Sequence, residues 1–198
     1  MIIGLTGNIA SGKTTISNIL HETYRLPIID ADKIARKVVE PGEDTLTQLV
    51  HTFGEDILLA NGSLDRTKLG KIVFNDNDKL EKLNAIVHPA IRKQMAEDKN
   101  KLIQEGYKHI VMDIPLLFEN NLTYLVDKTL VVYTEETIRM QRLMKRNNFS
   151  EEEARNRMNA QMSAEKKKQL ADEWLDNSGT IQASKQQLEE ILKKWSIV

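Results

Sequence analysis

The sequence predicts an α/β fold in which a mainly parallel, five-stranded sheet is flanked by helices. Short apolar runs recur along the chain, segments with helical spacing of apolar residues separate them, and a glycine-rich loop follows the first run. Alternating strands and helices favour a parallel sheet covered on both faces, with ligand sites at the carboxyl ends of the strands. We expect a helical subdomain and a helical lid beside this core.

Two segments, 109–113 and 128–133, are short, apolar and partly β-branched, as buried parallel strands are. Residues 2–6 form a short apolar run, 26–30 resemble a second strand, and we expect a last strand at 173–176. The spacing of apolar residues predicts helices over 16–21, 34–39, 135–146 and 182–194. A further helix begins at Ser150, because Ser150 and Glu153 have the spacing of a capping box.

The segment from about residue 45 to residue 106 is predicted to be a helical insertion. It has helical spacing, polar interruptions at 61–62 and 75–78, and no convincing strand. We therefore expect one domain with three parts. The core covers residues 1–42, 107–146 and 172–198, the helical subdomain covers 43–106, and the lid covers 147–171.

Composition narrows the kinds of partner. The 198 residues include 28 Lys and Arg against 29 Asp and Glu, so no overall basic field attracts nucleic acid or an anionic membrane. Cysteine is absent, which excludes disulfides and thiolate chemistry and fits a reducing compartment. No apolar run approaches the length of a membrane span, and no basic signal region opens the chain. We expect a cytoplasmic protein with no nucleic-acid, membrane or obligatory protein partner.

Residues 7–14 match the phosphate-binding pattern G-x-x-x-x-G-K-[ST] between a strand and a helix. In such a loop the backbone N–H groups surround phosphates, Lys13 reaches the β and γ oxygens of ATP, and the Thr14 hydroxyl ligates Mg²⁺. An ordinary glycine-rich turn with an exposed lysine is the alternative, which the flanking elements disfavour. Because alanine resists a positive φ, we expect Ala10 in a right-handed or extended conformation. The predicted ATP-binding residues here are Asn8, Ile9, Ala10, Ser11, Gly12, Lys13, Thr14 and Thr15.

Carboxylates follow two of the predicted strands. Asp30 and Asp32 come after the second strand, and a carboxylate there can accept the proton of an attacking hydroxyl in phosphoryl transfer. We assign this role to Asp32, with Asp30 as an orienting group or a water-bridged Mg²⁺ contact. Alternatively, Asp30 caps the next helix and Asp32 lies in its first turn. Asp113 ends the third strand, where it either supports Mg²⁺ or merely terminates the strand.

Three arginines, at positions 139, 142 and 146, share one face of a predicted helix. Their guanidinium groups would point together and neutralise phosphates, and we assign Arg142 and Arg146 to ATP binding. A solvated basic face is the alternative. The following stretch, Ser150 to Gln161, would close as a lid that excludes water. The run Lys166–Lys168 is weaker evidence for a phosphate site, since lysine runs are usually solvated, and of the three only Lys167 gains weight from the resemblance given below.

The sequence resembles the dephospho-coenzyme A kinase family over nearly the whole chain. The first loop indicates only the broad class of P-loop kinases, whereas Asp30-Ala31-Asp32, His88-Pro89 and Pro115-Leu116-Leu117-Phe118-Glu119 in this order are specific. Further blocks that agree are Gly4-Leu5-Thr6-Gly7, Ile34-Ala35-Arg36, Glu40-Pro41-Gly42, Gln141-Arg142, Arg146, Gln161, Lys167, Ala171-Asp172 and Asn177-Ser178-Gly179.

The resemblance implies a P-loop kinase core with a helical substrate domain and a lid. It also implies Mg²⁺-dependent transfer of phosphate from ATP to the 3′-hydroxyl of the ribose of dephospho-coenzyme A, which gives coenzyme A and ADP. It makes Asp32 the base, with Lys13 and Arg142 also catalytic. The implied substrate-binding residues are Asp32, Arg36, His88, Arg92, Leu116, Phe118, Glu119, Gln161 and Lys167.

Other interpretations stay open for some of these residues. His88 would cap a helix or fill the core, and Leu116 and Phe118 would be core packing. A kinase for another nucleoside or nucleotide would share the same core. A nucleotide-binding switch is disfavoured, because Asn100-Lys101-Leu102-Ile103 lacks the final Asp of the guanine-specific N-K-x-D motif.

Overall fold

A computed structural model describes residues 1–74 and 76–198. The chain divides into two units, one formed by residues 1–29 with 102–198 and the other by residues 30–101. Residue 75, in the polar interruption predicted at 75–78, lies outside the described residues. Among the described residues, no helix is long and apolar enough to cross a membrane.

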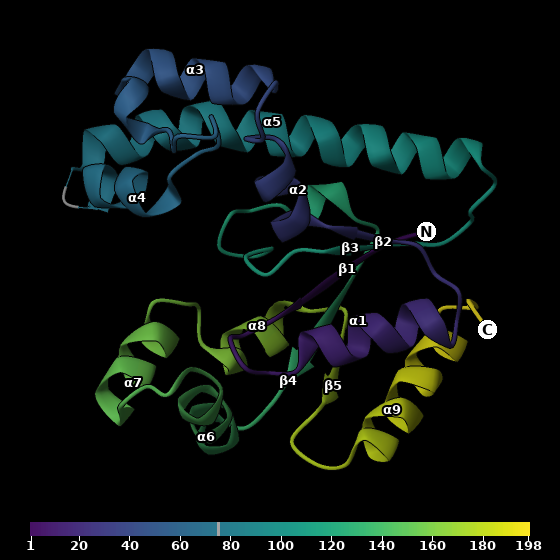
Figure 1. The fold of residues 1–198 in the computed structure, drawn as a ribbon. Coiled ribbons are helices and arrows are strands. Elements are labelled where there is room, and N and C mark those ends of the chain that lie inside the picture. Colours follow the sequence, from purple (N-terminus) through teal and green to yellow (C-terminus); the bar gives the residue numbers. More distant parts are fainter. Residues whose placement is uncertain (75) are drawn as a thin grey trace. The chain divides into compact units, whose positions relative to one another are not determined.

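The first unit is built on a sheet of five strands in the order β2-β3-β1-β4-β5 (Figure 1). Strand β1 pairs in parallel with β3 and β4, and β4 pairs in parallel with β5. The predicted parallel, five-stranded sheet is therefore confirmed. The strands are β1 (Ile2–Gly7), β2 (Ile28–Asp30), β3 (Ile110–Asp113), β4 (Lys128–Tyr133) and β5 (Glu173–Asp176), and the last residue of β2 already belongs to the second unit.

The helices of this unit begin close to the predicted positions. Ser150 and Glu153 form the predicted capping box, in which each side chain accepts a hydrogen bond from the backbone of the other residue. Thr180 caps the terminal helix through its side chain. The helices are α1 (Lys13–Glu22), α6 (Glu136–Asn147), α7 (Glu151–Asn159), α8 (Ala164–Leu170) and α9 (Ile181–Lys194), with a 3₁₀ turn, η2, at Thr123–Leu125.

The two faces of the sheet are covered differently. On one face, Ile3 and Leu5 of β1 join a buried cluster with apolar residues of α1 and α9 (Figure 1). On the other face, Gly4 leaves room for the chain that follows β3. A Cβ at Gly4 would lie 2.9 Å from Leu117 and 3.0 Å from Val126, so a larger residue would push this segment off the strand.

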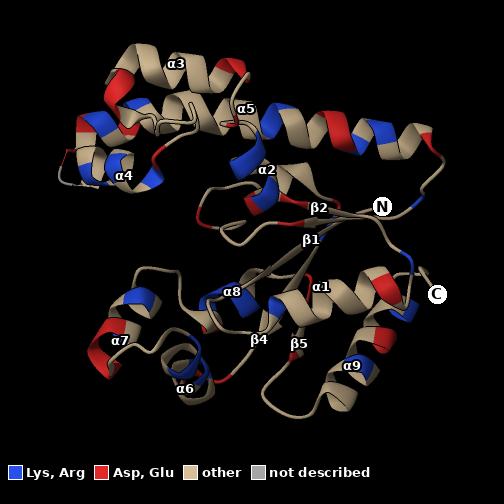
Figure 2. Ribbon diagram, in the orientation of Figure 1, with Lys and Arg blue, Asp and Glu red and all other residues tan. Residues whose placement is uncertain are grey.

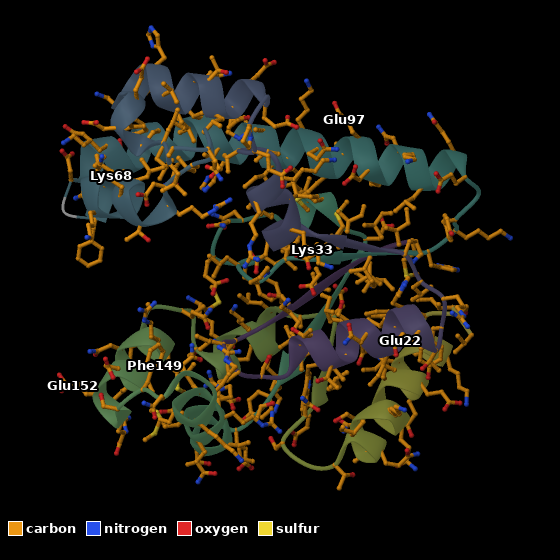
Figure 3. All side chains as sticks on the ribbon, viewed as in Figure 1. Glu22, Lys33, Lys68, Glu97, Phe149 and Glu152 are labelled. Atoms are coloured by element: carbon orange, nitrogen blue, oxygen red, sulfur yellow. The ribbon has the colours of Figure 1, made fainter. Side chains whose placement is uncertain are left out.

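A second, smaller cluster joins α6 and α7. Met140 and Leu143 of α6 are buried against Ala154 and Met158 of α7. Figure 3 shows Phe149 beside this pair and Glu152 extending away from it. The partly buried side chains that pack on the cluster are Ile9, Ala10, Met144 and Phe149, so the loop after β1 packs against the cluster formed by α6 and α7.

The second unit is helical, as expected for this part of the chain. Apart from Asp30 at the end of β2, its strand-type pairing within the described residues is an isolated bridge between Leu58 and Leu64. Pro89 lies inside the long helix α5 and deprives it of one backbone hydrogen bond. The elements are α2 (Ala31–Lys37), α3 (Asp44–Phe53), the 3₁₀ turn η1 (Glu55–Ile57), α4 (Arg66–Phe74) and α5 (Asn77–Gln104), whose last three residues belong to the first unit.

Candidate active site

The loop after β1 turns directly into α1, which begins at Lys13. The Ser11 N–H donates to the Asn8 carbonyl at 3.0 Å, and Gly12 takes a left-handed conformation with φ 85°. Any side chain at Gly12 would also collide with the Asn177 amide. The Thr15 N–H donates to the Gly12 carbonyl at 2.9 Å, whereas the first N–H groups of a helix lack an acceptor one turn earlier, so the loop and the helix N-terminus together favour an anion.

Two residues, one directly after β4 and one directly after β5, hold the end of the loop. The Ser11 carbonyl accepts hydrogen bonds from the Thr134 hydroxyl at 2.9 Å and from the Asn177 side-chain amide at 2.8 Å. Ser184 donates in turn to the Asn177 side chain at 2.8 Å. Thr134 has no role predicted from the sequence, and Asn177 enters there only as part of the family resemblance. Their position directly after an apolar strand is the signal that could have identified them.

The expectation for Ala10 was wrong, because its φ is +62°. A left-handed alanine costs about 1–2 kcal/mol. Neighbouring contacts offset that cost: the Ile9 N–H donates to the Gln161 side chain at 2.8 Å, and Ile9 and Ala10 pack on the α6–α7 cluster. These contacts come from residues distant in the sequence, and local preference does not anticipate them.

Lys13 and Asp113 form an ion pair at the carboxyl ends of β1 and β3. Asp113 is buried, and β3 presents it at its last residue as predicted. The exposed Thr14 lies in the first turn of α1. Among the described residues, no group of three His, Cys, Asp or Glu side chains could hold a metal ion. The oxygen atoms of Thr14 and Asp113 are the type of ligand that Mg²⁺ takes, and Mg²⁺ commonly keeps several waters beside one or two protein ligands.

The three arginines all lie on α6, and their guanidinium groups differ in burial and in hydrogen-bond partner. Arg139 is 5% exposed and donates to the Thr134 carbonyl at 3.0 Å, and burial lowers its pKa. Arg142 donates to the Asn177 carbonyl at 3.0 Å, and the exposed Arg146 donates to Asn147. Each guanidinium has found a local oxygen acceptor. Figure 2 shows basic positions on both α6 and α8.

A cavity of about 350 Å³ lies beside the start of the loop. Most of its lining residues are polar, and the buried Arg139 is among them. At its edge, a hydrogen bond with Glu165 raises the pKa of Tyr133 to about 12, so this phenol stays protonated at neutral pH. The lining residues are Asn8, Tyr133, Thr134, Glu136, Arg139, Met158, Asn159, Gln161, Ser163, Ala164 and Glu165.

Lys167 and Glu119, both predicted substrate contacts, form an ion pair of 2.9 Å. Lys167 has no exposed surface and also donates to the Pro115 carbonyl at 3.1 Å. Lys167 is therefore not a solvated member of its lysine run. Burial lowers its pKa even though the Glu119 carboxylate acts in the opposite direction. Nearby, Phe118 is only 7% exposed, which fits core packing, whereas Leu116 is 38% exposed.

The remaining predicted residues lie in the second unit. The Asp30 side chain accepts a hydrogen bond from the Lys33 N–H at 3.0 Å, so the alternative that it caps α2 is confirmed. Asp32 and Arg36 are exposed one turn apart on α2. His88 and Arg92 are likewise exposed one turn apart on α5. Since His88 lies inside this helix and is exposed, it neither caps a helix nor fills the core.

The parallel sheet, the loop at the start of α1 and the Lys13–Asp113 pair define a P-loop kinase. The model of the dephospho-CoA kinase family matches residues 1–183. The chain belongs to this family and is accordingly a phosphotransferase of coenzyme A synthesis.

Individual relatives agree with the family. The dephospho-CoA kinase of Oceanobacillus iheyensis is 52% identical over 197 residues, which cover 100% of this chain and 98% of that one. The dephospho-CoA kinase of Geobacillus kaustophilus is 53% identical over 195 residues, 98% of this chain and 96% of that one. The solved structure of dephospho-CoA kinase from Campylobacter jejuni superimposes with a TM-score of 0.74 at 29% identity, covering 98% of this chain and 96% of that one.

Proposed function

We propose that this family member transfers the γ-phosphoryl group of ATP to the 3′-hydroxyl of the ribose of dephospho-coenzyme A. The ribose oxygen forms the new bond to phosphorus, the bond to the β-phosphate oxygen breaks, and ADP leaves. The single observation that carries the proposal is the phosphate loop with Lys13 beside the carboxylate of Asp113. Family membership supplies the acceptor.

ATP binds along the loop in this proposal. The backbone of residues 8–12 and the first turn of α1, through Thr15, surround the phosphates. Lys13 leaves Asp113 to contact the transferred phosphate. Arg142 lies beside Gly12, with one guanidinium nitrogen 3.7 Å from the position of a Cβ there. It can therefore reach the nucleotide, and Arg146 follows one turn later on the same helix.

Mg²⁺ accompanies the nucleotide in this proposal. The Thr14 hydroxyl would be its direct protein ligand, and Asp113 would act through a bound water. Bound Mg²⁺ would neutralise charge on the β and γ phosphates. Asp113, once separated from Lys13, would keep its negative charge close to that ion.

Asp32 accepts the proton of the ribose hydroxyl. Its carboxylate is exposed on the first turn of α2, so it is available to an incoming substrate. Such a base contributes about 10²–10⁴-fold to the rate. The cations of Arg36 and Arg92, with His88, suit the phosphates of dephospho-coenzyme A. Leu116, Phe118 and Glu119 complete the proposed acceptor contacts, and Gln161 and Lys167 stay predictions as direct contacts.

The test is ADP formation by the purified protein with ATP and one acceptor at a time. The acceptors are dephospho-coenzyme A, adenosine, AMP, CMP and dTMP, with a reaction lacking acceptor as the blank. We expect turnover with dephospho-coenzyme A alone, loss of turnover when the metal is chelated, and product phosphate on the 3′ oxygen. Preference for another acceptor would overturn the proposed substrate, and turnover in chelator would overturn the role of Mg²⁺. A cytoplasmic location stays a prediction from the cysteine-free composition.

A further inference from the structure

We propose that Lys167 is a positioning residue that fixes the start of the phosphate loop through Glu119 and the segment Gln161–Met162. The end of the lid would then set the geometry in which the loop binds ATP. The inference rests on the proposed use of this loop for ATP, and it assigns Lys167 and Gln161 a role other than direct contact with the acceptor.

The first step is the burial of the Lys167 ammonium. A fully buried lysine is stable only when its charge is paired and its hydrogen bonds are satisfied. Glu119 supplies the opposite charge at 2.9 Å and Pro115 supplies a carbonyl at 3.1 Å. The same Pro115 carbonyl accepts a hydrogen bond from Thr6 on β1 at 2.9 Å. Lys167 thereby ties α8 to the strand that leads into the loop.

The second step is the orientation of Glu119. One carboxylate oxygen receives both the Lys167 ammonium and the Met162 N–H, the latter at 3.2 Å. The other oxygen is buried without a hydrogen-bond partner. A buried carboxylate is stable only when an opposite charge lies beside it, and the Lys167 ammonium supplies that charge. Loss of the Lys167 charge would therefore release Glu119 from Met162.

The third step leads from Met162 to the loop. The Met162 carbonyl accepts a hydrogen bond from the Asn8 side chain at 2.7 Å. The neighbouring Gln161 side chain accepts one from the Ile9 N–H at 2.8 Å. The loop is thus held at two places: Asn8 and Ile9 by the lid segment, and Ser11 by residues after β4 and β5. The left-handed Ala10 lies between the two holds.

Four variants test this chain of contacts: Lys167→Met, Gln161→Leu, the double variant of both, and Lys166→Met. Lys166 is the exposed neighbour on the same helix and serves as the matched control. We expect each of the first two to raise the Kd and KM for ATP roughly fivefold to tenfold, the usual effect of losing one hydrogen bond near a ligand. The KM for dephospho-coenzyme A should change much less in Gln161→Leu.

The double variant distinguishes one shared path from two separate effects. If Lys167 acts through Gln161–Met162, the Kd for ATP in the double variant will be close to the Kd of whichever single variant binds ATP less tightly. Multiplication of the two effects would overturn the proposal, as would an unchanged Kd for ATP in Lys167→Met with only a lower Tm. In case Lys167→Met folds poorly, Lys167→Met with Glu119→Gln removes both charges and provides a foldable protein for the same ATP titration.

The ATP titration of the parent protein separates this inference from the proposed function. A parent protein that does not bind ATP would contradict the proposed function. A parent that binds ATP while Gln161→Leu binds it equally well would contradict only the positioning role. Lys166→Met should match the parent in every readout.

Discussion

Lys13 and Asp113 neutralise one another at the adjacent carboxyl ends of β1 and β3. The pair is largely shielded from water, with side-chain exposures of 17% and 6%. Replacing Lys13 by Met leaves a buried carboxylate without this cation. We expect the free energy of unfolding to fall by about 3 kcal/mol, since breaking a buried ion pair on one side is strongly destabilising.

A double variant at Lys13 and Asp113 should recover stability without recovering turnover. Lys13→Met with Asp113→Asn removes both charges and should recover most of the lost stability. ADP formation should stay at least about 100-fold below that of the parent protein, because the cation that stabilises the transferred phosphate is still missing. Urea unfolding and steady-state kinetics on the same samples test this. Recovery of turnover along with stability would mean that Lys13 has no catalytic role.

Asp32→Asn keeps the size of the side chain and removes its basicity. We expect kcat to fall at least about tenfold with little change in the Kd for ATP, since a general base contributes at least that much. Lys33→Gln, at the next exposed position of α2, is the control. Equal kcat values for the parent protein and Asp32→Asn would remove Asp32 from catalysis. Asp30→Ala should instead lower the free energy of unfolding by about 1 kcal/mol through loss of the helix cap.

At two positions of the phosphate loop the backbone is left-handed, so adding a methyl group at Gly12 should lower the stability and removing one at Ala10 should raise it. Gly12→Ala meets both a left-handed backbone and the Asn177 amide, so ATP binding and stability should both be lost. Ala10→Gly removes the conformational strain of a left-handed alanine, which is about 1–2 kcal/mol. Glycine also makes the unfolded chain more flexible, which costs about 0.5–1 kcal/mol of folding free energy. We expect a small rise in Tm, and a clear fall in Tm would show that Ala10 is unstrained.

We expect the stability to depend on pH through His109. Burial lowers the pKa of this imidazole below 6.5, with smaller contributions from the N-terminal ammonium and Lys108, and its Nδ1 has no hydrogen-bond partner. The unfolded chain therefore takes up the proton more readily than the folded chain. We expect this residue to contribute nothing above about pH 6.5 and to reduce the free energy of unfolding progressively at lower pH.

Urea unfolding of the parent protein and His109→Gln between pH 7.5 and pH 5 measures this contribution. The parent protein should lose more stability on acidification than the variant. An equal decline in both proteins would show that other groups carry the pH dependence.

The strand positions and the phosphate loop could be read from the sequence because both signals are local. Each strand is a short apolar run, and the loop is a fixed spacing of Gly7, Gly12 and Lys13. The capping box at Ser150 is equally local, since both partners lie within one turn. For such features the neighbouring residues determine the structure, and the rest of the fold only agrees with them.

The errors involve side chains whose partners are distant in the sequence. Lys167 looks like one of three solvated lysines, yet Glu119 and Pro115 bury it. Ala10 takes a positive φ that its own side chain disfavours, in a loop held by Gln161. The spacing of apolar residues along the chain gives no information about such contacts between distant residues. The substrate contacts assigned by resemblance, such as Asp32 and His88, likewise stay predictions about residues that the structure shows only as exposed.

The strand order also has a consequence for how the chain folds during synthesis. β1 is the central strand, yet its partners β3 and β4 start at Ile110 and Lys128. During synthesis, the apolar residues of β1 therefore have no strand partner until the segment between β1 and β3 has been made. Contacts between residues so distant in the sequence slow folding, and the unpaired apolar strand can meanwhile aggregate with other chains. Newly made chains should thus depend on chaperones until residues of β4 have emerged.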